Sequence, residues 1–127
     1  MLKDSKVTTV LPAEDLDRAI DFYQNKLGLK KVEGSEQMGG VAFEAGEGSQ
    51  IYIYERARTV AQHTVASFSV DKIEDIMGEL REKGVKFEEY DMGELKTVNG
   101  VATMGDMKAA WFKDTEGNIL ALDQYSK

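Results

Sequence analysis

The chain has 127 residues, a formal net charge of −7 and no cysteine. Its length fits one ordinary domain with a real core. The absence of cysteine excludes disulfides, thiolate nucleophiles and zinc sites built from cysteine. The acidic balance argues against nucleic acid and anionic membrane surfaces, which attract basic patches, so we expect neither as a partner.

The beginning of the chain, MLKDSKVTTV, carries charges where a signal peptide would need an apolar run. No stretch of the sequence approaches the roughly 18 apolar residues that a membrane-spanning helix requires. We therefore expect a cytoplasmic protein.

The first half of the chain predicts a helix between strands. An apolar stripe of Leu16, Ile20, Tyr23 and Leu27 predicts the helix, and Gly28 stands where a helix end favours a left-handed residue. The helix is expected at 14–28, and strands are expected at 6–12, 29–33, 40–45 and 49–55.

The second half predicts the same order. Asp71 and Glu74 have the spacing of a capping box at a helix start, and Gly84 ends the helix. One apolar stripe is formed by Ile73, Ile76, Met77 and Leu80. The helix is expected at 71–84, and strands are expected at 63–70, 85–90, 108–114 and 118–124.

The two halves repeat one another. Asp15 and Asp71 stand at equivalent helix starts, but the last strands of the two halves lie further apart than the helices do. This difference places about 13 additional residues in the segment 91–107. We infer a duplicated βαβββ unit and an α+β fold. The prediction is a single domain over 1–127, with module one at about 1–56 and module two at about 63–127.

Two segments carry a family resemblance, DLDRAIDFYQNKLGLKKV and WFKDTEGNILAL. They resemble the signature segments of the vicinal oxygen chelate superfamily, which includes glyoxalase I, extradiol dioxygenases, fosfomycin-resistance enzymes and bleomycin-resistance binding proteins. The resemblance implies two βαβββ modules that form an open curled sheet around a cavity, with the helices outside. It implies no particular reaction, because one fold hosts many activities.

The alternation of residues along the strands predicts which side chains face this cavity. One face, which includes Val7, Leu11, Ile53, Phe68 and Leu122, is expected to pack against the helices. The other face is mixed, aromatic and hydrogen-bonding, as in small-molecule pockets. Its candidate ligand-binding residues are Thr8, Tyr52, Tyr54, His63, Val65, Ala121 and Asp123, with Ser67 and Ser69 on the same face. Trp111 is a further candidate, although the sequence leaves open whether Trp111 or Phe112 faces the cavity.

The resemblance also implies where a metal would bind. The metal-bearing relatives place ligands at positions that correspond here to Thr8, Tyr52, Val65 and Ala121. None of these four is a good ligand for a divalent ion, and the chain has one histidine. A shifted site that uses His63 and Asp123 is the remaining option. We predict no metal and no cofactor.

Catalysis without a metal would depend on few groups. His63 is the candidate general base, with Asp123 to orient it, and a tyrosine could donate a hydrogen bond to an oxyanion. The alternative is that both side chains only hydrogen-bond a ligand.

The predicted function is metal-independent binding of an aromatic or partly cationic small molecule, as in the bleomycin-resistance branch. Stacking on tyrosine or tryptophan and a carboxylate at Asp123 would suffice for such binding. A glyoxalase-like lyase or isomerase, or a dioxygenase-like enzyme, is the alternative, and a module that only associates with another protein is a third option. Because relatives usually dimerise and open sheet edges can pair, we expect a homodimer.

Overall fold

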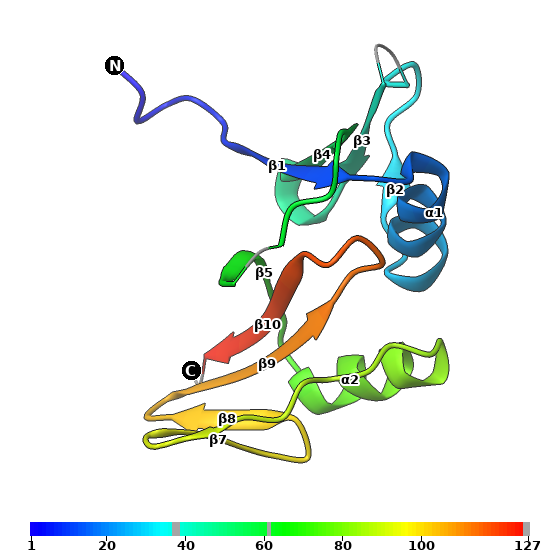
Figure 1. Cartoon of the computed structure of the whole chain (residues 1–127). Helices are drawn as coiled ribbons and strands as arrows, with labels where there is room; N and C mark the ends of the chain where they lie inside the picture. Colours follow the sequence, from blue (N-terminus) through cyan, green and yellow to red (C-terminus); the bar gives the residue numbers. More distant parts are fainter. Residues whose placement is uncertain (37–38, 61, 126–127) are drawn as a thin grey trace. The chain divides into compact units, whose positions relative to one another are not determined.

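The computed structural model describes residues 1–36, 39–60 and 62–125. The chain forms two compact units, Met1–Val60 (unit 1) and Ala61–Lys127 (unit 2), each with one open sheet and one α-helix (Figure 1). The fold is α+β, as predicted. Within the described residues, no helix is long and apolar enough to cross a bilayer.

Unit 1 contains a four-stranded sheet with the order β1-β4-β3-β2. β1 and β4 are parallel, whereas β3 is antiparallel to both of its neighbours. Its elements are β1 (Thr8–Ala13), α1 (Leu16–Asp21), the π-helical turn η1 (Phe22–Lys26), β2 (Lys30–Lys31), β3 (Gly40–Glu44), the 3₁₀ turn η2 (Gly46–Gly48) and β4 (Gln50–Glu55). The predicted βαβββ order is therefore present in this unit.

The first helix begins where the sequence predicts and turns a different face to the core. The Asp15 carboxylate caps it by accepting a hydrogen bond from the Arg18 backbone N–H at 3.0 Å. The predicted stripe is wrong in part, because Leu16, Ile20 and Leu27 stay partly exposed whereas the core-facing residues are Ala19, Phe22 and Tyr23. The π turn bonds residues five apart and so departs from the 3.6-residue period on which the prediction relied.

The core of unit 1 lies on the helix-covered face of its sheet. Its buried strand residues are Leu11, Ala13, Val41, Phe43, Ile51 and Ile53. Val7 was predicted on this face but is 87% exposed, because β1 begins only at Thr8.

Unit 2 contains a six-stranded sheet with the order β5-β10-β9-β8-β7-β6. Its elements are β5 (Thr64–Ser69), α2 (Ile73–Glu82), β6 (Asp91–Met92), β7 (Leu95–Val98), β8 (Val101–Met104), β9 (Met107–Lys113) and β10 (Ile119–Tyr125). The additional segment 91–107 forms β6, β7 and β8. The strand predicted at 85–90 is absent, since this segment makes only an isolated bridge between Phe87 and Phe112.

The second helix is capped from a distant strand. Asp71 and Glu74 form no capping box, because α2 begins at Ile73 after the N-cap residue Lys72, which provides no side-chain cap. The Ile73 N–H instead donates to the side-chain oxygen of Gln124 in β10 at 2.7 Å. The predicted apolar stripe is confirmed for the buried Ile73, Met77 and Leu80.

The two sheets are equivalent at a constant offset of 69 positions along their last two strands. Phe43 pairs with Ile51 in unit 1, and Phe112 pairs with Leu120 in unit 2. All four side chains are buried on the helix-covered face of their own sheet. The opposite faces, which no helix of the same unit covers, are called the open faces below.

Candidate functional site

The open face of unit 1 carries two of the predicted aromatic residues. Tyr52 and Tyr54 of β4 are both partly exposed, and the Tyr54 hydroxyl accepts a hydrogen bond from the Arg56 guanidinium at 3.4 Å. Thr8 lies on the same face at the start of β1, opposite Gln50 and exposed. All three side chains therefore stand where the alternation of the strands predicts.

Tyr52 lies across the neighbouring strand rather than standing upright from the sheet. A Cβ added to Gly40 of β3 would stand 1.9 Å from the Tyr52 hydroxyl oxygen and 2.3 Å from Cζ. Tyr52 and Gly40 are diagonal neighbours, because Tyr52 pairs with Ala42 and Tyr54 pairs with Gly40. Glycine is thus required at position 40 for the ring to take this place.

Trp111, and not Phe112, lies on the open face of unit 2. Trp111 pairs with Ala121 of β10, so the two side chains share a face. Phe112 is fully buried on the opposite face against Phe87. The Trp111 ring meets the Tyr90 ring edge to face, with centroids 5.5 Å apart and an interplanar angle of 78°. This contact holds the indole in a defined orientation.

Asp123 is fixed by two hydroxyl groups of the adjacent strand. Ser67 donates to Oδ2 at 2.5 Å and Ser69 donates to Oδ1 at 2.7 Å. The predicted face includes both serines, but nothing in the sequence indicates that they orient this carboxylate. The role emerges only from the parallel pairing of β5 with β10, which places Ser69 opposite Asp123.

His63 and Asp123 are not brought together. His63 precedes β5 and is exposed, whereas Asp123 pairs with Ser69 at the other end of that strand. Six residues of extended chain correspond to roughly 20 Å at about 3.3 Å per residue. This arrangement provides no dyad in which Asp123 could orient His63. Val65 is partly exposed, and Ala121 is buried in β10.

The donor set at the four family metal positions does not fit a divalent ion. The side chains of Val65 and Ala121 have no lone pairs, and Thr8 and Tyr52 offer only hydroxyl groups. Within residues 1–36, 39–60 and 62–125, no group of three or more His, Cys, Asp or Glu side chains could hold a metal. The resemblance-based position for a metal therefore lacks the chemistry for one.

A turn of buried polar groups holds β9 and β10 together. Asp114 Oδ1 accepts hydrogen bonds from the backbone N–H groups of Glu116 at 2.8 Å and Asn118 at 2.9 Å. The Asn118 side-chain amide donates to Asp114 Oδ2 at 2.8 Å. Gly117 has φ +86°, a conformation that glycine adopts without a steric penalty in such a turn. The turn fixes the register that sets Trp111 opposite Ala121.

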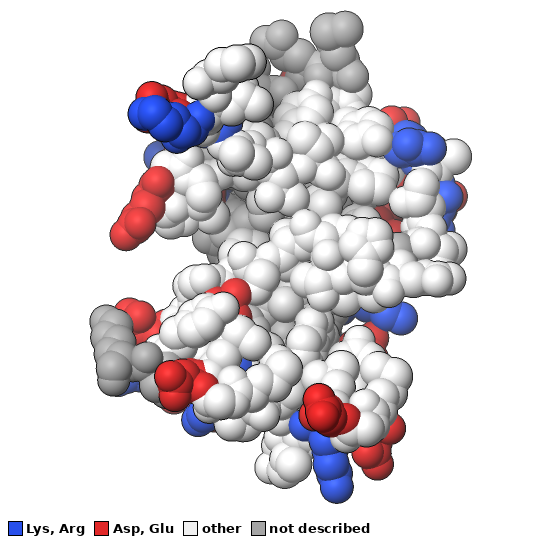
Figure 2. Space-filling model, turned by 90° about the vertical axis from the view of Figure 1, so that its left-hand side faces the viewer, with Lys and Arg blue, Asp and Glu red and all other residues white. Residues whose placement is uncertain are grey.

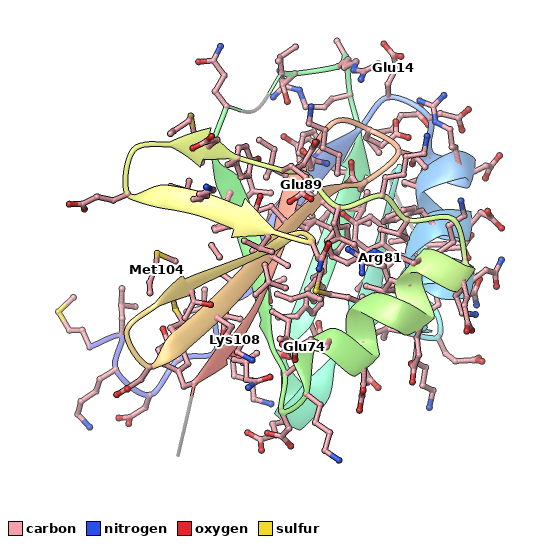
Figure 3. All side chains as sticks on the ribbon, turned by 90° about the horizontal axis from the view of Figure 1, so that it is seen from below. Glu14, Glu74, Arg81, Glu89, Met104 and Lys108 are labelled. Carbon is pink, nitrogen blue, oxygen red and sulfur yellow. The ribbon has the colours of Figure 1, made fainter. Side chains whose placement is uncertain are left out.

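A second polar cluster joins the segment 85–90 to the β7–β8 hairpin. Glu89 accepts hydrogen bonds from the Thr97 hydroxyl at 2.6 Å and the Gly100 N–H at 2.8 Å. These bonds, together with the nearby Arg81, lower the pKa of Glu89 (Figure 3). Burial, followed by the charge of Glu88, raises the pKa of Tyr90.

On the helix-covered face of the unit 2 sheet, Lys108 of β9 donates a hydrogen bond to Glu74 of α2 at 2.8 Å, and this hydrogen bond lowers the pKa of Glu74 (Figure 3).

On the side drawn in Figure 2, uncharged residues occupy most of the surface, and acidic and basic side chains are interspersed. The net charge of −7 thus forms no single large acidic area on that side.

Comparisons with known proteins place the chain in a family. No curated protein matches it. TnmS3, an antibiotic binding protein from Streptomyces sp. CB03234, is similar in structure with a TM-score of 0.72 and 17% identity, over 99% of each chain. The fosfomycin resistance protein FosX from Listeria monocytogenes has a TM-score of 0.72 and 16% identity, over 96% of this chain and 92% of that one.

The TM-scores of these two structures show a shared fold. The family model of the Glyoxalase/Bleomycin resistance protein/Dioxygenase superfamily matches residues 7–122, which is nearly the whole chain. The resemblance of the two signature segments is confirmed, and the protein belongs to this superfamily.

Proposed function

We propose that this protein binds a small organic molecule, aromatic or partly cationic, without a metal ion. The observation that carries the proposal is the pair of open faces, which present aromatic rings and one carboxylate fixed by two serine hydroxyls. Tyr52, Tyr54 and Trp111 offer stacking surfaces, and Asp123 offers a charge-assisted acceptor. That TnmS3 is an antibiotic binding protein supports a binding role for this fold.

Binding of this kind needs no catalytic group. The candidate general base, His63, lies far along β5 from Asp123, the carboxylate proposed to orient it. The prediction that all eight candidate residues line one cavity concerns both units together, and it stays a prediction. Homodimer formation and a cytoplasmic location are likewise parts of this proposal.

The test is metal analysis combined with thermal unfolding. We expect less than one tenth of an equivalent of any transition metal per purified chain, and the same Tm with EDTA, with added Zn²⁺ or Ni²⁺, and with buffer alone. One equivalent of bound metal, with a Tm that falls on addition of EDTA, would overturn metal independence and favour the lyase or isomerase.

Two further measurements complete the test. Mass spectrometry of the protein under non-denaturing conditions should find a small organic molecule retained from the producing cells. Light scattering at micromolar concentration should give the mass of two chains, and a monomer there would contradict the expected homodimer.

A further inference from the structure

Four positions on the open face of unit 2 form a rectangle across β9 and β10. Asp123 pairs with Ala109, and Ala121 pairs with Trp111. Trp111 and Asp123 thus occupy one diagonal, and the two alanines occupy the other. Diagonal neighbours in an antiparallel pair lie about 7–8 Å apart. The large ring and the carboxylate are therefore separated by a short span whose remaining corners carry only methyl groups.

The two ends of this diagonal are accessible and oriented. Trp111 and Asp123 are partly exposed, whereas the residues Ala109 and Ala121 are 4% and 5% exposed. The Tyr90 ring contacts the indole in a T-shaped arrangement, which restricts how the indole can rotate. Ser67 and Ser69 fix the carboxylate, one on each oxygen.

The charge of Asp123 has no cationic partner within the described residues. Its carboxylate accepts hydrogen bonds from the two serine hydroxyls, and the ion pairs of Lys3, Lys31, Lys108 and Lys113 involve other acids. An ionised carboxylate only accepts hydrogen bonds, and each oxygen has a second lone pair beyond the one that a serine uses. A cationic N–H group is the partner that this arrangement favours most.

We propose that this diagonal is a subsite for a planar group that carries a cationic nitrogen, of the ammonium, amidinium or guanidinium class. The planar group stacks on Trp111, and the nitrogen donates to Asp123. This inference rests on the proposed function and names the ligand class that one part of the binding surface selects. Ser67 and Ser69 act as positioning residues, because they touch the carboxylate and not the ligand.

Trp111 is the one tryptophan of the chain, so its fluorescence reports on this subsite alone. The probes are benzamidinium, benzamide and benzoate, which share a planar shape and differ in charge. We expect benzamidinium to change the Trp111 emission with a Kd at least ten-fold lower than that of benzamide, and benzoate to bind most weakly. The preference for benzamidinium over benzamide should fall as NaCl is added, since salt screens charged contacts.

Four variants locate the effect. Asp123→Asn should raise the Kd of benzamidinium at least ten-fold and leave that of benzamide within two-fold. Asp75→Asn removes the same charge from an exposed position on α2 and should change neither value. Ser69→Ala should reduce the preference for charge about three-fold, and Ser69→Thr, which keeps the hydroxyl, should retain it.

Equal affinity for benzamidinium and benzamide, or equal effects of Asp123→Asn and Asp75→Asn, would overturn the subsite. The proposed function would survive that result if a neutral aromatic probe still bound. If no probe of any charge altered Trp111 emission, the subsite would be wrong, and metal content with EDTA treatment would decide the proposed function independently.

Discussion

The open faces of the two units place their large side chains differently. In unit 1 the matching rectangle consists of Tyr52 and Tyr54 on β4 and Ala42 and Gly40 on β3. Its two large side chains stand on one strand, and one of them, Tyr52, lies over the backbone of Gly40. In unit 2 the large groups stand on a diagonal, and no side chain longer than a methyl occupies the other diagonal. The equivalent positions, 69 residues apart, are Tyr52 and Ala121, Ala42 and Trp111, Tyr54 and Asp123, and Gly40 and Ala109.

This comparison teaches that a duplicated unit can keep its core and diverge on its open face. The helix-covered faces retain aromatic and aliphatic residues at matched positions, because close packing tolerates few changes of volume. The four matched positions of the open faces instead all carry different residues. In unit 1 the ring covers its own sheet, whereas in unit 2 the ring and the carboxylate are left to contact a ligand.

The largest expected effect comes from the matched core residues, Phe43 and Phe112. Each ring is fully buried, so Phe43→Ala or Phe112→Ala should cost about 3–5 kcal/mol of unfolding free energy. Urea unfolding followed by far-UV circular dichroism reports on both units, and Trp111 fluorescence reports on unit 2. If the chain is one cooperative domain, Phe43→Ala shifts both signals to one midpoint. A fluorescence midpoint unmoved by Phe43→Ala would show that the units unfold separately.

The turns before β4 and β10 share a backbone hydrogen bond but differ in their side-chain hydrogen bonds. Ala45 N–H donates to the Ser49 carbonyl at 2.9 Å, and Asp114 N–H donates to the Asn118 carbonyl at 3.0 Å, but only Asp114 adds a carboxylate. Asp114→Ala should cost about 2–4 kcal/mol, because it leaves buried N–H groups without an acceptor. Asp106→Ala, at an exposed turn position, should stay within about 0.5 kcal/mol in the same urea measurement.

Substitution of Gly40 tests how the Tyr52 ring packs on the open face of unit 1. Gly40→Ala places a methyl group where the Tyr52 ring lies, so it should cost about 1–3 kcal/mol of unfolding free energy. In a Tyr52→Ala background the same substitution meets no ring and should cost less than about 1 kcal/mol. Equal costs in both backgrounds, measured by urea denaturation, would mean that the ring does not depend on Gly40.

Local patterns in the sequence predict the α+β fold, the duplication and the faces of most strands. The Asp15 cap, the positive φ of Gly28, Gly84 and Gly117, and the stripe of α2 follow from the residues themselves. The cap of α2 could not be predicted this way, because Gln124 lies 51 residues beyond Ile73. Periodicity could not reveal the π turn either, since that turn breaks the period.

In the candidate site, too, the sequence predicts local features but not contacts between distant segments. Alternation places Thr8, Tyr52, Ala121 and Asp123 on open faces, but it does not pair residues of different strands. The roles of Ser67, Ser69 and Gly40 depend on register across strands, and that of Tyr90 on a segment outside the strands; the sequence encodes neither at any fixed spacing. For the same reason the sequence suggested a dyad of His63 and Asp123 that the parallel pairing of β5 and β10 keeps apart.

The smallest expected effect concerns Glu89, which accepts hydrogen bonds from the β7–β8 hairpin, a part of the sheet that unit 1 lacks. Hydrogen bonds from Thr97 and Gly100 lower its pKa below the ordinary value of 4.5. Because the pKa is lower in the folded state, ionised Glu89 stabilises the fold above pH about 4.5, and this contribution is lost as the pH falls through the folded-state value. Glu89→Gln should therefore lower the urea midpoint at pH 7 slightly and leave it closer to that of the parent below pH 4. The exposed Glu79→Gln should show no such dependence, and parallel pH profiles for parent and Glu89→Gln would contradict the assignment.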